Sequence, residues 1–307
     1  MKKLVLLAVV LLLSATCTWA QLKIPADEGH QKCTLQTMTG TYAFSERGSS
    51  SYADMTGTAM SPPAPPPFWN ALDAPFATVG EVTFAPNGVG EGFYWIWTGL
   101  VPATLDPIPV TVTITEMNPD CTGKFSYTVP GTPPVNIVER FIAIDEGREF
   151  RSVPATIENG VPGLAWIGEG HRIRKADEGA RSCGAQTAHG TYVTTAINVV
   201  NFFGTTGFAD ALIMYTKNSK TGQFTGTLYE KLGVFPEPIE DPIYGNVTVH
   251  PDCSFEETLY IPAISGIVPI RGVFYNEGKE FYAMAVNDPA NPGGIIYSIG
   301  EGKRIDE

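Results

Sequence analysis

The residues of this chain that could do chemistry are few, and they do not fall into the spacing of a recognised catalytic or metal site. Its four histidines, His30, His171, His189 and His250, include no H-x-x-x-H pair, and no cysteines stand at metal-binding spacing. The sequence contains no Gly-x-Ser-x-Gly elbow and no glycine loop that would cradle a phosphate before a helix. We therefore expect no catalytic residues, no metal and no cofactor.

Carboxylates are the next candidates, because a pair of them facing one cleft can hydrolyse a glycoside. Three of them recur in two parts of the chain, namely Glu146 with Glu277, Glu149 with Glu280, and Glu169 with Glu301. The first two of each set flank a predicted hairpin turn, where charges usually face solvent. We interpret them as surface residues rather than as an acid and base pair.

Aromatic residues offer a different chemistry, the binding of an apolar ligand. In the run Phe93–Trp97, strand alternation places Phe93, Trp95 and Trp97 on one face. If that face points inward, these side chains line a ligand cavity, and Tyr229 supplies a further lining residue later in the chain. The alternative is that they form a packed core or a patch against another domain.

Four sequence blocks occur twice in the same order, which indicates that the chain is built from two copies of one unit. The pairs are Cys33–Tyr42 with Cys183–Tyr192, Asn118–Cys121 with His250–Cys253, Asp145–Phe150 with Asn276–Phe281, and Ile167–Ile173 with Ile299–Ile305. The first copy is longer by about 18 residues, and the proline-rich run Ser61–Pro67, which cannot join a sheet ladder, is the expected insertion. The expected organisation is a signal peptide at 1–20, an N-terminal segment at 21–32, a first domain at 33–174, a linker at 175–182 and a second domain at 183–307.

The first residues have the pattern of an export signal. Lys2 and Lys3 precede the apolar run Leu4–Leu13, and Thr18–Ala20 is an A-x-A-like cleavage site. Ten apolar residues are too few to span a bilayer, which needs about 20. We expect a secreted or periplasmic protein with a bacterial-type signal; a membrane anchor and a lipidated Cys17 are the alternatives.

Four cysteines remain after the predicted signal: Cys33, Cys121, Cys183 and Cys253. In an oxidising compartment they predict two disulfides, for which three pairings are possible. The pairing of Cys33 with Cys121 and of Cys183 with Cys253 is favoured, because it gives each copy its own bridge.

The composition argues against some partners and favours a β-rich fold. A net charge of −12 lacks the basic footprint that nucleic acid or an anionic membrane surface needs. The chain holds 32 glycines and 25 prolines, but 43% of its residues are hydrophobic and only 17% are charged. That balance is typical of a turn-rich β protein rather than of a disordered chain.

Short segments with alternating β-branched and aromatic residues predict strands throughout, as in Val110–Ile114 and Lys124–Val129. No amphipathic helix of convincing length is found. The regular spacing of strands and turns predicts an antiparallel β-sandwich or an up-and-down β-barrel. The opening and closing motifs of each copy, described next, favour the barrel and leave the β-sandwich as the second choice.

Each copy opens with Gly-Thr-Tyr and closes with Gly-Glu-Gly-x-Arg-Ile, which resembles the pattern of calycins, the lipocalins and their relatives. The resemblance implies that an aromatic residue of the first strand lies against an arginine of the last strand: Tyr42 against Arg172, and Tyr192 against Arg304. This chain has Tyr where lipocalins have Trp, and the other lipocalin motifs and C-terminal helix are missing. The repeat unit also resembles secreted bacterial β-domains of unassigned function.

These observations favour an exported two-barrel protein that binds a small apolar ligand or a surface partner without chemistry. A cofactor-free barrel cyclase or isomerase remains open, because such enzymes need no recognisable motif. A purely structural role in the envelope or matrix is the third possibility.

Overall fold

The structure, a computed structural model, confirms that the chain is an all-β protein. The described residues are 32–50, 74–98, 105–130, 134–158, 165–174, 183–202, 205–232, 239–264, 266–286 and 296–306. The predicted signal peptide, the proline-rich run and the linker at 175–182 lie outside the described residues.

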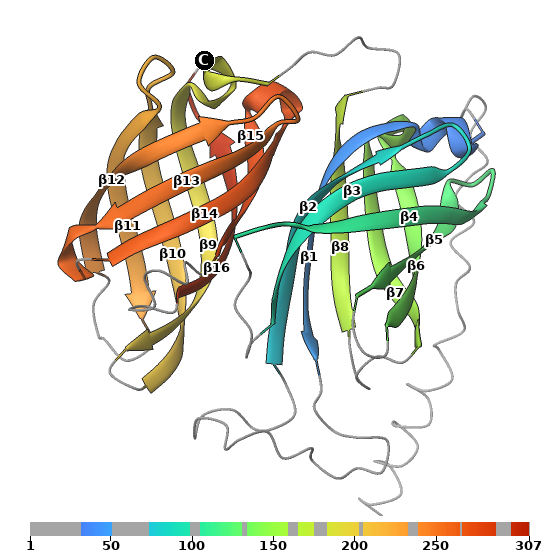
Figure 1. Cartoon of the computed structure of the whole chain (residues 1–307), viewed down its shortest axis with the longest axis horizontal. Coiled ribbons are helices and arrows are strands. Elements are labelled where there is room, and N and C mark those ends of the chain that lie inside the picture. Colours follow the sequence, from blue (N-terminus) through green and yellow to red (C-terminus); the bar gives the residue numbers. More distant parts are fainter. Residues whose placement is uncertain are drawn as a thin grey trace, which may run out of the picture. The chain divides into compact units, whose positions relative to one another are not determined.

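The first copy forms a closed barrel of eight strands in the order of the chain, with β1 paired to both β2 and β8 (Figure 1). All neighbouring strands run antiparallel. The strands are β1 (Gly40–Ser50), β2 (Ala74–Phe84), β3 (Val89–Thr98), β4 (Ile108–Met117), β5 (Thr122–Val129), β6 (Val135–Ile144), β7 (Glu149–Glu158) and β8 (Ala165–Arg174).

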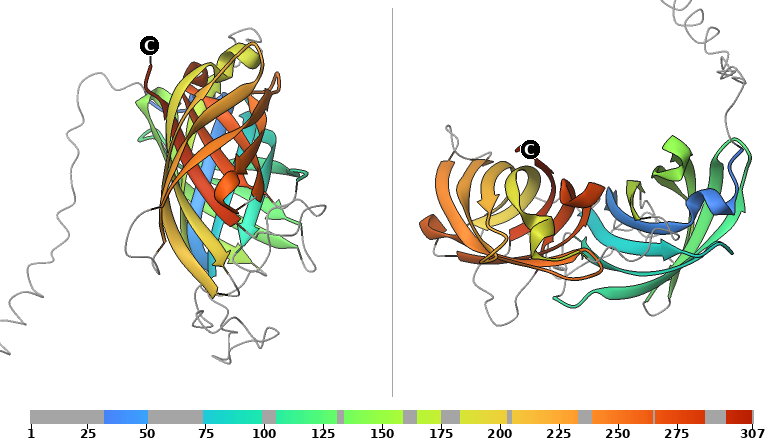
Figure 2. Two further views of the ribbon diagram at one scale, coloured as in Figure 1. Left: turned by 90° about the vertical axis from the view of Figure 1, so that its left-hand side faces the viewer. Right: turned by 90° about the horizontal axis from the view of Figure 1, so that it is seen from above.

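The second copy repeats this barrel, and β9 pairs with both β10 and β16 to close it. Figure 2 shows the strong coiling of the strands that closure requires. The strands are β9 (Gly190–Phe202), β10 (Thr205–Lys217), β11 (Gln223–Leu232), β12 (Ile239–Val249), β13 (Ser254–Ile261), β14 (Gly266–Tyr275), β15 (Glu280–Ala285) and β16 (Ile296–Arg304). Two closed barrels in tandem confirm the prediction of antiparallel β-barrels over a sandwich.

The helices of the described residues are single 3-10 turns. They are η1 (Leu35–Met38), η2 (Asp145–Gly147), η3 (Ala185–Ala188), η4 (Pro262–Ile264) and η5 (Asn276–Gly278). Within the described ranges, no helix has the length and apolar character needed to cross a membrane.

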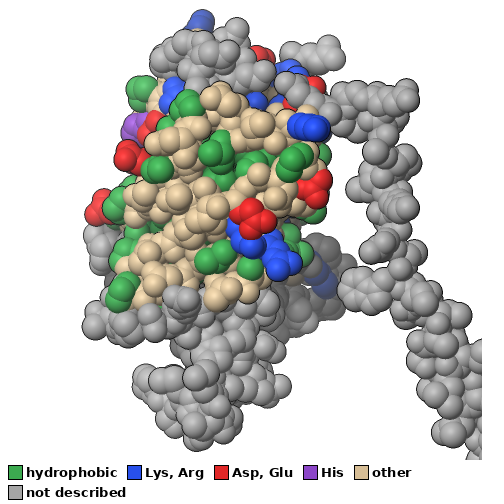
Figure 3. Space-filling model, turned by 90° about the vertical axis from the view of Figure 1, so that its right-hand side faces the viewer, with side chains coloured by type: hydrophobic (Ala, Val, Ile, Leu, Met, Phe, Trp, Pro, Cys, Tyr) green, Lys and Arg blue, Asp and Glu red, His purple; other side chains and the backbone are tan. Residues whose placement is uncertain are grey.

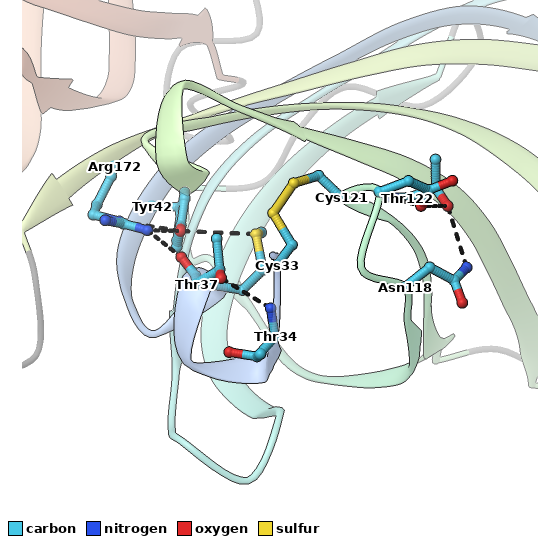
Figure 4. The surroundings of a disulfide bond; sticks show 10 residues. Cys33, Thr34, Thr37, Tyr42, Asn118, Cys121, Thr122 and Arg172 are labelled. Carbon is cyan, nitrogen blue, oxygen red and sulfur yellow. Dashed lines mark hydrogen bonds between the residues drawn. A yellow bond between two sulfur atoms is a disulfide. The ribbon is translucent and has the colours of Figure 1, made fainter. Parts of the chain in front are cut away.

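One end of the first barrel is closed around Tyr42, whose ring is fully buried (Figure 4). Its hydroxyl donates a hydrogen bond to the Gly147 carbonyl oxygen at 2.6 Å and accepts bonds from Arg172 Nε at 3.1 Å and Nη2 at 2.8 Å. The Arg172 guanidinium also lies 5.4 Å from the centre of the Tyr42 ring. The arginine that the resemblance placed against Tyr42 therefore contacts both the ring and its hydroxyl.

The second barrel is closed in a related way by Tyr192, whose hydroxyl donates to the Gly278 carbonyl oxygen at 2.7 Å. Here a lysine lies over the ring: Lys217 Nζ is 5.3 Å from its centre. Arg304 pairs with Tyr192 in the strand register, and its Nη1 donates to the His189 carbonyl oxygen at 3.3 Å. Arg304 also hydrogen-bonds the Tyr192 hydroxyl and opposes the rise of its pKa, so both copies have the predicted arginine at the tyrosine, and the second copy adds Lys217 over the ring.

The recurring Glu-Gly turn has a steric reason. In η2, Asp145, Glu146 and Gly147 all have positive φ, at 50°, 56° and 74°. A Cβ on Gly147 would lie 2.3 Å from the Thr37 carbonyl oxygen, so only glycine allows the close approach that Tyr42 then hydrogen-bonds. The Glu146 side chain is exposed, in agreement with its interpretation as a surface residue.

Two disulfides join Cys33 to Cys121 and Cys183 to Cys253, which confirms the favoured pairing. Each bridge ties the segment before the first strand to the turn before the fifth strand of its own barrel, and Figure 4 shows the first of them. Such bonds persist in oxidising, extracytoplasmic surroundings.

We expect the double substitution Cys33→Ser/Cys121→Ser to lower the free energy of unfolding of the first barrel by about 4 kcal/mol, because the bridge closes a long loop in the unfolded chain. The bonded cysteines are 88 residues apart. Denaturation followed by tryptophan fluorescence measures this, since no tryptophan follows residue 166. Wild-type protein in reductant should lose a similar amount, and a loss below about 1 kcal/mol in both cases would contradict the expectation.

Candidate functional site

The structure places the aromatic residues of β3 on opposite faces, as alternation requires. Tyr94 lies in the core of the first barrel, whereas Trp95 and Trp97 are buried outside the barrel interior, in a cluster that includes Tyr275 and Tyr282 of the second copy. Phe93 packs against that outer cluster, with its ring centre 5.3 Å from that of Trp95.

Tyr229 lies apart from these three, 37% exposed on β11 of the second barrel. The cavity lining expected from Phe93, Trp95, Trp97 and Tyr229 is therefore not assembled in one place, and ligand binding by them stays a prediction.

The interior of the first barrel holds a group of polar side chains that the motif search did not select. They come from seven of the eight strands. Strand alternation turns five of them inward with core residues of their own strands, Tyr94 belongs to the core itself, and Trp166 reaches Glu139 from β8. We call them the polar cluster: Glu46, Thr78, Tyr94, Tyr127, Glu139, Ser152 and Trp166.

Two carboxyl groups lie at the centre of the polar cluster. The Tyr127 hydroxyl donates to Glu139 Oε1 at 2.6 Å, and Trp166 Nε1 donates to the same oxygen at 3.1 Å. Glu139 is fully buried, and Glu46 is 9% exposed. The Tyr127 hydroxyl also lies 3.5 Å from Glu46 Oε1, so one phenol contacts both carboxyl groups.

Three polar atoms of this interior are buried without a hydrogen-bond partner among the described residues: Glu139 Oε2, Tyr94 Oη and Ser152 Oγ. Ser152 faces Glu46, since a Cβ built on Gly168 would lie 2.3 Å from Ser152 Oγ and 3.4 Å from Glu46 Cγ. Each buried polar group without a hydrogen-bond partner lowers the stability of the fold by about 1–3 kcal/mol, so the presence of three such groups needs an explanation.

Burial raises the pKa of Glu46 well above its ordinary value, and the charge of Glu139 and a hydrogen bond with it raise that pKa further. Hydrogen bonds from Thr78 and Tyr127 oppose the shift only in part. Burial, and then the charge of Glu46, raises the pKa of Tyr94 to about 12. Burial and the neighbouring carboxyl group therefore favour the protonated form of Glu46, and the raised pKa values of Tyr94 and Tyr127 keep both phenols neutral at neutral pH.

At six of the seven corresponding positions the second barrel has apolar residues. Strand register aligns six members of the polar cluster with residues of the second barrel. Every counterpart is apolar: Ala196, Ala211, Leu228, Leu259, Ile270 and Ala283. A cavity of about 40 Å³ lies there, lined in part by four of them. One copy is thus packed as an apolar core where the other is polar.

The second barrel has a buried charge pair at a different level. Lys217 Nζ lies 2.8 Å from Glu257 Oε2, and both side chains are almost completely buried. Five aromatic rings surround the ammonium at 4.9–5.3 Å. Burial lowers the pKa of Lys217, and Glu257 opposes that shift. The first barrel has Phe84 and Phe125 at these two positions.

The polar cluster can bind a polar group of a ligand or move a proton, but it does not resemble a metal site. Among the described residues, no three His, Cys, Asp or Glu side chains are grouped so that they could hold a metal ion. The two carboxyl groups are accompanied by hydroxyls and an indole N–H, which donates rather than coordinates.

The outer surface over β4, β5 and β6 carries a groove of about 580 Å³, lined mainly by threonine, serine and asparagine. Tyr127 and Ile137 belong both to this groove and to the wall beside Trp166. Figure 3 shows that this side of the molecule is dominated by uncharged side chains, with acidic and basic groups at a few spots. The groove adds contact area next to the polar cluster but no charge.

Alignment of the two copies through their cysteines and their Glu-Gly turns would have found the polar cluster. Tyr127 lies six residues after Cys121, and its counterpart six residues after Cys253 is Leu259. Counting six residues back from the start of each Glu-Gly turn likewise aligns Glu139 with Ile270. The signal was a set of polar residues in one copy at positions that are apolar in the other.

Comparison with known proteins shows similarity of fold only. No family model matches the chain, and no curated protein matches its sequence. One similar structure is transferrin binding protein B from Haemophilus parasuis, with 8% identity, a TM-score of 0.33, and coverage of 87% of this chain and 76% of that one. Another is a protein of unknown function from the DUF3598 family of Nostoc punctiforme, with 9% identity, a TM-score of 0.24, and coverage of 89% and 100%.

The raised pKa of Glu46 predicts how the stability depends on pH. The folded state holds a proton that the unfolded chain releases above about pH 4.3, so the free energy of unfolding falls as the pH rises, by at most about 1.4 kcal/mol per pH unit from this group. Glu46→Gln should remove that part of the slope and be more stable than its parent at pH 8.

Glu81 on β2 needs a matched background in this experiment. Burial raises its pKa to about 8, with the charge of Asp252 adding to the shift and that of Arg174 opposing it. The comparison is therefore between Glu81→Gln and Glu81→Gln/Glu46→Gln, unfolded in urea at pH 5 and at pH 8. Equal slopes in the two proteins would show that Glu46 is ionised in the fold.

The charge pair of the second barrel leads to a second expectation. Lys217→Met should lower the free energy of unfolding by about 3–5 kcal/mol, because it leaves Glu257 buried without a cation. Adding Glu257→Leu should restore most of the loss, since two apolar side chains can replace a buried pair at little cost. Urea unfolding followed by circular dichroism tests both; a double variant as unstable as Lys217→Met would contradict the expectation.

Proposed function

We propose that this chain is an exported binding protein that holds a small, largely apolar molecule inside its first barrel, with the polar cluster recognising one polar group of that molecule. The observation that supports the proposal most strongly is the difference between the copies. Six inward-facing polar residues of the first barrel are all apolar in the second, although both interiors must be filled for the same fold.

Stability alone does not account for the polar cluster. The second barrel closes without these polar residues, which shows that the architecture does not require them. Polar groups that are buried without hydrogen-bond partners destabilise the fold, and in native proteins such groups are found most often at functional sites. A ligand that supplies the missing partners would offset that cost.

The surroundings of the polar cluster suit a ligand that is mostly apolar. Trp166 and Ile137 form a small buried cluster, against which Ile96, Val129 and Val135 pack while remaining partly exposed. Binding sites for small molecules commonly combine such apolar walls with a few convergent polar groups. The second barrel, with its apolar core, is proposed as a supporting domain.

Export is part of the proposal. The N-terminal pattern of a short basic start, an apolar run and a small-residue cleavage site predicts transport out of the cytoplasm. The two disulfides fit a periplasmic or extracellular location.

A second candidate function is proton transfer by a cofactor-free enzyme. Burial beside Glu139 raises the pKa of Glu46, and two carboxyl groups in one site can act as general acid and general base when their surroundings separate their pKa values. Turnover distinguishes the two functions: an enzyme converts its ligand, whereas a binding protein returns it unchanged after extraction.

Native mass spectrometry of protein purified from its own exported fraction tests the proposal. We expect a discrete extra mass that is lost on extraction with organic solvent and recovered chemically unchanged. The matched control is Glu46→Ala/Glu139→Ile, in which both glutamates are replaced by the residues found at the corresponding positions of the second barrel. This variant should carry no cargo. Cargo that is equally abundant in this variant would exclude the polar cluster as the binding site.

A further inference from the structure

We propose that the group recognised by the polar cluster is a primary ammonium, so that the ligand is an organic amine with an apolar body. The inference rests on the proposed function and specifies its ligand class. Three observations support it: the carboxyl groups have no cation among their partners, three buried oxygens have no hydrogen-bond partner, and an ammonium would balance the charge of a buried carboxylate.

The first argument is charge. Glu46 and Glu139 are buried together, and the partners found for them among the described residues are hydroxyls, the Trp166 indole and each other, none of which is a cation. In the second barrel the one buried glutamate, Glu257, has its own cation in Lys217. At the position of that lysine the first barrel has Phe84, so the described residues supply no equivalent cation for its carboxyl groups.

The second argument is the set of unpartnered atoms. A primary ammonium has three N–H donors and no acceptor. The polar cluster has three buried oxygens without a partner, Glu139 Oε2, Tyr94 Oη and Ser152 Oγ. The tyrosine and serine are each 3% exposed and do not belong to the carboxyl pair, so they are an independent sign that something is bound beside it.

The third argument is the balance of charge in a dry interior. One ammonium balances the charge of one ionised carboxylate, so that the complex of the two is neutral. A neutral complex avoids the large cost of leaving net charge in a medium of low polarity. Glu139 is already held as an acceptor by the Tyr127 and Trp166 donors, so little reorganisation is needed on binding.

An organic cation fits these residues better than a metal ion. A calcium ion takes six to eight oxygen ligands, whereas here Trp166 Nε1 and the Tyr127 hydroxyl already donate to one of the carboxylate oxygens. The unpartnered Glu139 Oε2, Tyr94 Oη and Ser152 Oγ instead offer acceptors to the N–H donors of an ammonium group. The partly exposed Ile96, Val129 and Val135 would contact the apolar body of the ligand.

Isothermal titration calorimetry with two matched probes tests the inference on the full chain. The probes are 2-phenylethylamine, which is a primary ammonium at pH 7, and 2-phenylethanol, which has the same body without the charge. We expect the amine to bind to wild-type protein at least tenfold more tightly than the alcohol. In Glu139→Gln that preference should fall to less than threefold.

Two further variants keep the test informative. Glu91→Gln, an exposed glutamate on β3, is the matched control and should leave the affinity for the amine unchanged. If Glu139→Gln does not fold, Ser152→Ala replaces it, because alanine is the residue of the second barrel at that position; it should weaken the amine and leave the alcohol unaffected.

The outcomes separate the inference from the proposed function. Equal binding of amine and alcohol would overturn the ammonium assignment and leave a binding protein for neutral molecules. Absence of saturable binding of either probe would also overturn it, while the search for natural cargo by mass spectrometry would still decide the proposed function.

Discussion

A closed eight-stranded barrel turns every second side chain of each strand into an interior from which water is excluded, and this constraint governs the rest of the molecule. An apolar residue stabilises the barrel there, whereas a charge is tolerated only with a partner. Tyr42 and Tyr192 satisfy the constraint by hydrogen bonds from their buried hydroxyls to the carbonyl oxygens of Gly147 and Gly278. Glu139 satisfies it only in part, since Oε2 has no partner among the described residues.

The two copies show which interior changes packing can explain. The first barrel has Gly123 opposite Phe141, and the second has Phe255 opposite Gly272. A Cβ on either glycine would lie 2.5 Å from the neighbouring phenylalanine ring, so the ring has moved from one strand to the next while the volume is kept. The polar cluster shows no such exchange between strands. Its residues differ from their counterparts in the second barrel in polarity as well as in volume. Packing thus accounts for the aromatic exchange, and function is the better account of the polar one.

Much of the fold could be predicted from the sequence because its signals are local or repeated. Strand alternation, turn residues and four duplicated blocks predict two tandem β-domains, the resemblance of their opening and closing motifs to calycins favours barrels, and the copy symmetry favours the disulfide pairing. The role of Phe93, Trp95 and Trp97 as the lining of a ligand cavity depends on which face of β3 points into the barrel. Alternation separates the two faces of a strand, but with aromatic residues on both faces of β3 it does not say which face is inside.

The candidate site could not be predicted in the same way. Glu46 follows a Thr-Tyr-Ala-Phe-Ser strand segment and reads as an exposed residue near a strand end. Glu139 stands in Val138-Glu139-Arg140, where a charged neighbour also suggests exposure. Only the register of β1, β5 and β6 brings these carboxyl groups and Tyr127 together inside the barrel. The pairing of strands that are distant in the sequence decides which of these side chains are buried, and the local sequence pattern does not specify that pairing.

The central claim is that burial beside Glu139 inside the first barrel favours the protonated form of Glu46. Infrared spectroscopy at pH 7 tests it directly, because a protonated carboxylic acid absorbs separately from a carboxylate. The proteins compared carry Glu81→Gln, because burial raises the pKa of Glu81 to about 8 and this residue would contribute its own protonated band. The account predicts a protonated carboxyl band in Glu81→Gln that is lost in Glu81→Gln/Glu46→Gln and that shifts when 2-phenylethylamine is added. Identical spectra of these two proteins would show that Glu46 is ionised and would contradict the account.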